Sequence, residues 1–181
     1  MPNWCENNVI ISHKDKQKLI TLAKECMKDE CRLFNLILPQ PDWDTTPNDK
    51  GELPIVEKDK DGNSLARKFP DGSYDERWYD WNCNNWGCKW DIGGFYQDSF
   101  PINWDRNGYK LHLNFDTAWA PPIGVYNALV NQGYDVHADY IEGGIGYCGE
   151  YRDGSDNEYS FDDNDMPLKF KEQIQQWRAE D

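Results

Sequence analysis

The feature that most constrains the fold is a strict two-residue alternation of apolar and polar side chains over residues 109–115. Successive side chains of a strand point to opposite faces of its sheet, so this pattern predicts a strand with one buried face. Residues 122–132 follow with apolar side chains at helical spacing, and Gly133 supplies a permissive end. Residues 135–141 predict a further strand. The second half of the chain therefore predicts a β-α-β unit.

The first half repeats this order. Residues 8–12 are β-branched and apolar, which predicts a strand. Residues 14–28 carry apolar side chains at helical spacing, and residues 33–38 predict a second strand that Pro39 ends. Two β-α-β units predict an α+β, ferredoxin-like split β-α-β fold, in which two helices cover one face of an antiparallel sheet. We expect residues 1–181 to form a single domain.

An insertion over about residues 42–108 separates the two halves. Residues 42–79 are rich in Pro, Gly, Asp and Lys and show little periodicity, so we expect this part to be partly mobile. Residues 78–95 combine four Trp with three Gly. That mixture of bulky and permissive residues predicts packed, irregular backbone.

The C-terminal region adds three elements. Residues 145–151 predict a strand that follows a glycine turn. Residues 153–165 contain six acids and no Lys or Arg, which predicts a solvated loop or an added sheet edge. A final helix is predicted to begin near Pro167. Its apolar face is formed by Phe170, Ile174 and Trp177.

The charge of the chain limits its partners. There are 33 acids against 19 Lys and Arg, for a net charge of -14. Nucleic-acid binding proteins use basic surfaces to neutralise phosphates, so a nucleic-acid partner is disfavoured. Two interpretations stay open: the charge serves solubility, or an acidic face binds a basic protein.

The sequence also bears on location. No apolar stretch approaches the roughly 20 residues that span a bilayer, so we expect no membrane association. The first residues carry neither a basic segment nor an apolar one. We therefore expect a cytoplasmic protein of a bacterial host cell, with six reduced cysteines.

Four segments resemble the YubB ferredoxin-like family of phage and plasmid proteins. They are MPNWCENN (residues 1–8), LFNLILPQP (33–41), NWGCKWD (85–91) and FDTAWAPP (115–122). The resemblance spans about residues 1–151, and Cys88 stands where the family pattern has Thr. It implies a ferredoxin-like fold and a mobile-element setting, and it implies no reaction.

Metal and catalytic signatures are incomplete. Two cysteine pairs have four residues between their members: Cys26 with Cys31, and Cys83 with Cys88. This spacing is at the limit of structural zinc sites and lacks supporting ligands. Residues 57–62 resemble the start of a calcium-binding loop, but Lys68 stands where the bidentate Glu belongs. We therefore predict no catalytic residue, metal or cofactor.

The strongest candidate site is a group of aromatic and charged residues. Its members are Trp4, Trp81, Trp86, Lys89, Trp90, Asp91, Gly93, Asp116 and Trp119. One interpretation is a buried aromatic plug that fixes the insertion to the sheet. The other is a cleft in which indoles stack a ligand or hold a partner, with Lys89 as donor and Asp91 or Asp116 to orient it.

We therefore predict a non-catalytic binding protein of a phage or mobile element. It would act on a host protein, as a counter-defence inhibitor, through an acidic and aromatic-rich surface. The alternative is a protein that sequesters a nucleotide or nucleotide signal, with a basic pocket from Lys89, Arg106 and Lys110. A metal-dependent hydrolase is a third class and would require clustered Asp and His.

Overall fold

The main element of the computed structural model is a six-stranded antiparallel sheet. Its strands, in spatial order, are β4 (Ile102–Trp104), β5 (Lys110–Ala118), β1 (Trp4–Ser12), β6 (Asp135–Glu142), β7 (Tyr147–Arg152) and β8 (Ser155–Ser160). The structure describes residues 3–28, 31–62, 64–92, 102–104 and 109–180; of these, the side chains of residues 64, 102–104 and 177–180 are outside the description. Gly93, Arg106 and the side chain of Trp177 therefore lie outside the described part.

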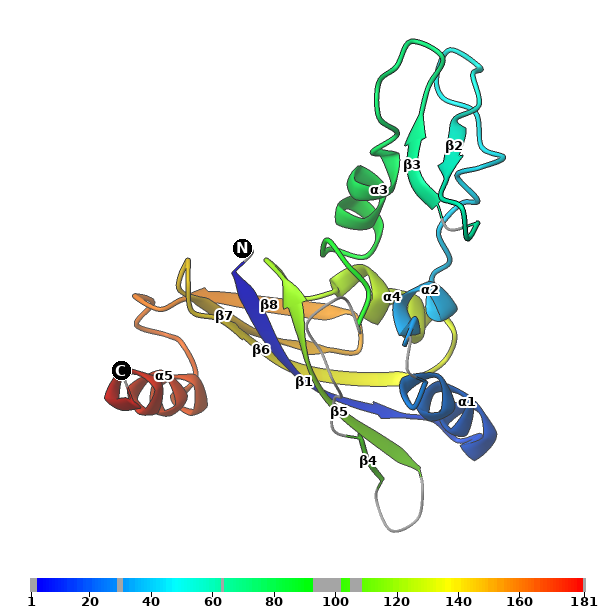
Figure 1. Ribbon diagram of the computed structural model, residues 1–181. Coiled ribbons are helices and arrows are strands. Elements are labelled where there is room, and N and C mark those ends of the chain that lie inside the picture. The colour runs from blue at the N-terminus through cyan, green and yellow to red at the C-terminus, as the bar shows by residue number, and fades with distance from the viewer. Residues whose placement is uncertain (1–2, 29–30, 63, 93–101, 105–108, 181) are drawn as a thin grey trace.

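Helices cover both faces of this sheet (Figure 1). On one face lie α1 (Lys16–Cys26), α2 (Leu33–Ile37) and α4 (Ile123–Asn131). The opposite face of β6 and β7 carries α5 (Leu168–Glu180). None of the helices in the described part is long and apolar enough to cross a membrane.

The ferredoxin-like fold is confirmed in the second half of the chain. β5, α4 and β6 form a split β-α-β unit, because β1 pairs antiparallel with both β5 and β6 and therefore lies between them. These elements match the segments that alternation and helical spacing predicted. β1 is longer than predicted, since it begins at Trp4.

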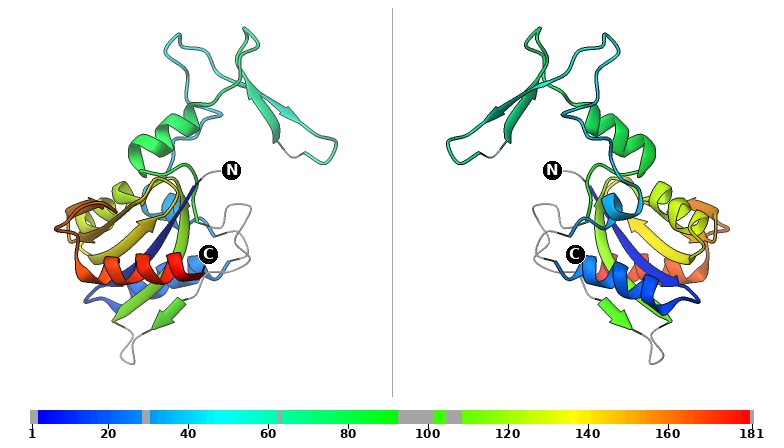
Figure 2. Two further views of the ribbon diagram at one scale, coloured as in Figure 1. Left: turned by 90° about the vertical axis from the view of Figure 1, so that its left-hand side faces the viewer. Right: turned by 90° about the vertical axis from the view of Figure 1, so that its right-hand side faces the viewer.

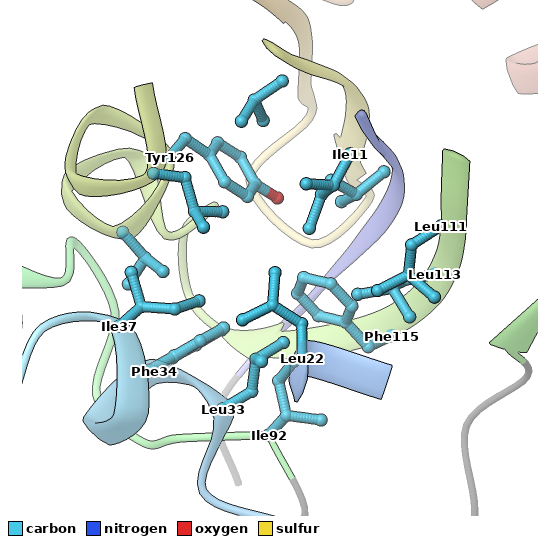
Figure 3. Close-up of a cluster of buried hydrophobic side chains, with 14 of the residues drawn as sticks. Ile11, Leu22, Leu33, Phe34, Ile37, Ile92, Leu111, Leu113, Phe115 and Tyr126 are labelled. Carbon is cyan, nitrogen blue, oxygen red and sulfur yellow. The ribbon is translucent and has the colours of Figure 1, made fainter. Parts of the chain in front are cut away.

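The main core forms between the sheet and its three helices (Figure 3). Alternate residues of β1 and β5, such as Val9, Ile11, Leu111 and Leu113, are at most 2% exposed. Burying such side chains contributes roughly 1.5–3 kcal/mol each, which makes this alternation the main source of stability. The α1 helix is positioned at its start by Asp15, whose side chain accepts a hydrogen bond from the Gln17 amide.

The predicted strand over residues 33–38 was wrong, because this segment is the helix α2. Leu33, Phe34 and Ile37 are at most 5% exposed, and their spacing suits one face of a helical turn. A short apolar run cannot distinguish a strand from a buried helix by pattern alone. A carboxylate distant in the sequence, Asp91, accepts hydrogen bonds from the first turn and favours the helix.

The C-terminal helix was predicted, and its position became clear only in the structure. Phe170 and Ile174 pack with Ile141 and Cys148, which point away from the main core. Beside them, Lys169 forms ion pairs with two sheet carboxylates, those of Asp139 and Glu150. α5 therefore covers the face of the sheet that α1 and α4 leave open.

The acidic segment over residues 153–165 forms an added edge of the sheet in part. Its first portion is β8, which pairs with β7 along six residues. Asp156 and Glu158 of β8 point to the same face of the sheet as the main core. Asp156 accepts a hydrogen bond there from the Tyr140 hydroxyl at 2.8 Å. Charged side chains on an edge strand disfavour pairing with another chain.

The insertion has more regular structure than its composition predicted. It contains the two-stranded hairpin β2 (Ile55–Lys58) and β3 (Ser64–Lys68), followed by α3 (Arg77–Asn85). The hairpin projects away from the main sheet (Figure 2). At its base the Arg77 guanidinium pairs with Asp75 at 2.7 Å and lies 5.1 Å from the ring centroids of Trp43 and Phe69. This small cluster anchors the hairpin without a large core.

Candidate functional site

The candidate site depends on a close approach between α3 and α4. A Cβ atom at Gly124 would lie 1.7 Å from the Asn85 carbonyl oxygen, and the Gly124 amide donates to the Trp86 carbonyl at 3.1 Å. Gly87 has φ of 94°, a backbone conformation that L side chains rarely adopt. The two glycines thus allow the end of α3 and the turn after it to contact the start of α4 directly. The residues that follow, up to Asp91, are held against the main body.

Two of the predicted tryptophans belong to the core. Trp86 is 2% exposed, and its indole Nε1 donates to the Leu38 carbonyl at 2.8 Å. Its ring meets those of Trp81 and Phe34 edge to face, with centroids 5.7 and 5.9 Å apart. Trp81 packs against the core while partly buried. For these two residues the aromatic-plug interpretation agrees with the structure.

Asp91 has a structural partner of its own. Its carboxylate accepts hydrogen bonds from the backbone amides of Phe34, Asn35 and Ile92 at 2.8, 2.8 and 2.7 Å. Burial raises the pKa of this carboxyl to about 6, although the amide hydrogen bonds act in the opposite direction. Asp91 therefore joins the insertion to α2, and its oxygens are engaged within the chain.

A partly exposed group, which we name the Lys89 cluster, consists of four predicted residues and Tyr79: Trp4, Tyr79, Lys89, Trp90 and Trp119. The Lys89 ammonium lies 4.4, 5.1 and 5.6 Å from the ring centroids of Trp90, Trp119 and Tyr79. Tyr79 meets Trp119 edge to face at 6.0 Å, and Trp4 lies 6.3 Å from Trp90. Each cation–π contact contributes about 0.5–2 kcal/mol, so the rings fix the position of the cation.

Two buried side chains hold the backbone of this cluster. The Asn82 amide nitrogen donates to the Lys89 carbonyl at 2.8 Å, and the Cys88 thiol donates to the Trp90 carbonyl at 3.3 Å. Burial raises the pKa of Cys88 well above its usual range, which keeps it a neutral thiol. A thiol at this position can thus act as the donor that a Thr hydroxyl would provide.

The backbone at Trp119 is strained. Its φ is 73°, in the left-handed region that bulky residues avoid at a cost of about 1–3 kcal/mol. The Trp119 amide donates to the Asn3 carbonyl at 2.9 Å, and its own carbonyl accepts from the Tyr147 hydroxyl at 2.7 Å. Trp119 as a residue remains 36% exposed. Two hydrogen bonds therefore hold a strained residue that presents its ring at the surface.

The structure gives Asp116 a different setting. It points from β5 to the face opposite the main core, where it stands directly across from Glu6. Burial raises the pKa of both carboxyls, and the Asp116 charge raises that of Glu6 further. The pair is a site of like-charge repulsion.

Lys110 lies too far from the Lys89 cluster to contribute to the predicted basic pocket. It lies at the first residue of β5, whereas Trp119 follows the last, and a strand of nine residues spans about 27 Å. Lys89 is thus the member of this trio that contacts the aromatic rings, and Arg106 is outside the described residues.

Tyr79 was missed by the sequence reasoning. It stands two positions before Trp81 in α3, so a helical turn of about 100° per residue directs the two rings to different sides. Had residues 78–85 been recognised as a helix, this difference would have separated the surface ring from the core ring.

Among the residues that the structure describes, no group of three or more His, Cys, Asp or Glu side chains could hold a metal ion. Lys68, at the position that a calcium loop reserves for Glu, forms an ion pair with Glu57 at 3.1 Å.

Residues 99–178 match a family model described as the ferredoxin-like domain in Api92-like protein. Among solved structures, the crystal structure of a protein api92 from Yersinia pseudotuberculosis is similar, with 12% sequence identity and a TM-score of 0.46. That match covers 92% of this chain and 100% of the other. No curated protein matches. The matched segment runs from β4 into α5, in agreement with the ferredoxin-like arrangement.

Proposed function

We propose that this chain is a non-catalytic binding protein and that the Lys89 cluster is its recognition surface. The partner we propose is a host protein in the bacterial cytoplasm, which the chain would inhibit on behalf of a phage or other mobile element. The mobile-element setting rests on the resemblance to the YubB family, and the inhibitory role rests on the net charge of -14. The binding surface rests on geometry.

The observation that carries the proposal is the strained, exposed Trp119. Local strain is retained where the surrounding structure imposes it, and such residues concentrate at functional positions. Tryptophan is also enriched among the residues that dominate binding energy at interfaces. Here two backbone hydrogen bonds and the Lys89 ammonium hold the indole in place, so little conformational freedom remains to be lost on binding.

The charge of the chain indicates the chemistry of the partner. A net charge of -14 favours encounter with a basic surface and repels nucleic acids. The carboxylates of Asp156 and Glu158 on the edge strand β8 are exposed and add to this field. We therefore expect a basic protein whose surface offers an apolar contact for Trp119.

Quantitative affinity capture tests this proposal. The tagged wild-type protein, Trp119→Ala and Met27→Ala are compared in lysates of the same bacterial host. Met27 is a matched control, because it is 76% exposed and lies at the end of α1. A basic protein retained by wild type and Met27→Ala, and reduced about tenfold or more by Trp119→Ala, is the expected result. Equal recovery of the basic protein by the wild type and both variants would contradict the proposal.

A small-ligand function is the second candidate, and one observation favours it. The Lys89 ammonium lies 4.4 Å from the centroid of the Trp90 ring. A ring that could stack on a base is therefore adjacent to a cation that could bind a phosphate group. Thermal-shift measurements with a panel of nucleotides distinguish the two functions. A stabilisation that Trp90→Ala and Lys89→Met both abolish would support nucleotide sequestration over a protein partner.

A further inference from the structure

The Lys89 cluster has the geometry of an aromatic cage whose occupant belongs to the same chain. The Lys89 ammonium lies 4.4 Å from the ring centroid of Trp90, and 5.1 and 5.6 Å from those of Trp119 and Tyr79. The Tyr79 and Trp119 rings meet at 84°, so they form two walls at nearly a right angle. Several rings within about 6 Å of one cation are the arrangement by which proteins recognise cationic ligands.

Two other lysines contact a ring in a different way. Lys68 lies 5.1 Å from the centroid of a single ring, that of Tyr74, and forms an ion pair with Glu57 at 3.1 Å. Lys169 has one ring contact and pairs with two carboxylates. Lys89 forms no ion pair with a carboxylate of the described residues, and three rings stabilise its charge instead. These rings are therefore arranged to hold a cation.

We propose that the three rings form a guanidinium site, which Lys89 fills in the free protein and which an arginine of the partner protein fills in the complex. The identity of the partner rests on the proposed function, and the inference adds the chemical group that the Lys89 cluster recognises. A guanidinium can displace the lysine because it is planar, more weakly hydrated than an ammonium and able to stack on aromatic rings. The displaced ammonium returns to water, where it is strongly hydrated.

The walls of the site are held independently of the lysine side chain. Two buried donors hold the backbone carbonyls of Lys89 and Trp90, and hydrogen bonds at both the amide and the carbonyl hold Trp119. These bonds involve backbone atoms, so they persist when the ammonium leaves. The backbone that carries the rings is thus already in place for a second cation, which reduces the ordering that binding would otherwise require.

The surroundings of the site carry the complementary charge. Trp4 contacts Trp90 and stands two residues before Glu6 in β1, so the side chains of Trp4 and Glu6 point to the same face of the sheet. Asp116 stands directly across from Glu6 on that face. An incoming cation reduces the repulsion between these two carboxylates. The acidic pair therefore favours a partner that carries an arginine over an anionic one.

Titration with a small guanidinium compound tests the site without any partner. N-acetylarginine amide is added to the wild type and three variants, and the indole N–H signals are followed by NMR. The variants are Lys89→Ala, the double variant Lys89→Ala/Trp119→Ala, and Lys68→Ala. The last is the matched control, because it removes a lysine that contacts one ring instead of three. N-acetylcitrulline amide, which has an uncharged urea group in place of the guanidinium, is the control ligand.

The expected result is that Lys89→Ala binds the arginine compound at least about threefold more tightly than the wild type does, because the internal competitor is gone. Lys68→Ala should bind it as the wild type does, and the double variant should lose the gain. Equal affinities of the wild type and Lys89→Ala would overturn the proposal. An equal gain for the citrulline compound would also overturn it. Circular dichroism establishes that each variant is folded.

The wild-type protein provides a second measurement that needs no variant. In the free protein the Lys89 Hε signals should lie upfield of those of exposed lysines, because they are close to aromatic rings. They should move toward the positions of exposed lysines as the arginine compound is added. If the indole signals respond to the compound and the Lys89 signals keep their positions, displacement is refuted.

Affinity capture separates a failure of this inference from a failure of the proposed function. Lys89→Ala should recover at least as much of a captured partner as the wild type does, because it removes a competitor and not a contact. A loss as large as that of Trp119→Ala would mean that the lysine itself binds the partner, and would overturn the displacement. If the arginine compound binds but no partner is captured, the proposed function fails and the guanidinium site stands.

Discussion

The chain between residues 81 and 91 contributes to two regions that differ in how they are held. In the buried region, Trp86 and Asp91 each have directional hydrogen bonds to backbone atoms of the segment over residues 34–38. In the exposed region, the side chains of Lys89 and Trp90 are held by the contact between a cation and a ring face. The buried region therefore carries stability, and the exposed region keeps surface available for binding.

This contrast shows that a dense aromatic sequence need not form one site. Residues only a few positions apart separate into core and surface, because α3 ends at Asn85 and the turn at Gly87 redirects the chain. Substitutions in the two regions should consequently have opposite profiles. Buried substitutions should lower stability, and exposed ones should lower binding with little effect on stability.

The largest expected effect is that of Trp86→Ala. It should lower the free energy of unfolding by about 3–5 kcal/mol, because it removes a buried indole and leaves the Leu38 carbonyl without its donor. Urea denaturation followed by circular dichroism measures the change. A loss below about 1 kcal/mol would show that the buried region does not carry the stability assigned to it.

The second prediction concerns pH and Asp91. Because burial raises its pKa from 3.8 to about 6 in the folded state, the folded protein binds this proton more tightly than the unfolded chain does. The resulting stabilisation is complete below about pH 4 and is lost as pH rises through 6, by up to about 3 kcal/mol. Subtracting the stability profile of Asp91→Asn from that of wild type isolates this contribution. A difference that does not change between pH 4 and 7 would contradict it.

The third prediction tests the joint between the insertion and the body. Gly124→Ala places a methyl group against the Asn85 carbonyl and should cost about 1–3 kcal/mol, because backbone on both sides must move. Gly72→Ala is the matched control, since no atom lies within 4 Å of its added Cβ and only the positive φ opposes it. Equal stability of the two variants in thermal denaturation would argue against a tight α3–α4 contact.

A smaller effect separates strain from contact at Trp119. Trp119→Gly should be about 1 kcal/mol more stable than Trp119→Ala, because glycine adopts a φ of 73° without a steric cost. Both variants remove the indole, so both should lose the captured partner equally. If the two variants have the same stability, the backbone at this position is not strained in solution.

The smallest effect is expected at Asp116, on the face of the sheet opposite the main core. Asp116→Asn should raise stability at pH 7 by less than about 1 kcal/mol, because it removes repulsion with Glu6 across the strand pair. Raised pKa values mean that this gain disappears at low pH, where both carboxyls are protonated in wild type. Urea titrations at pH 7 and pH 3 measure both parts, and a gain that persists at pH 3 would refute the repulsion.

The sequence predicted most of the residues of the candidate site, but it did not predict how they are arranged in space. The tryptophan density and the neighbouring Lys89 were visible in the sequence. Their division was not, because it depends on Gly124 in a helix some 40 residues away allowing α3 to approach. Trp119 and its neighbours meet only because the start of β1, the end of β5 and the β6–β7 turn lie at the same end of the strands.

The sequence by itself determined β5, α4 and β6, because two-residue alternation and helical spacing are local signals and both patterns lead to burial on one face. Only the tertiary structure decided that residues 33–37 are helical, since Asp91 accepts their first amides from a position 56 or 57 residues away. The same long-range contacts decided which aromatic rings are buried. A local pattern can predict that a residue will be covered, but what covers it is set by segments that meet only in the folded chain.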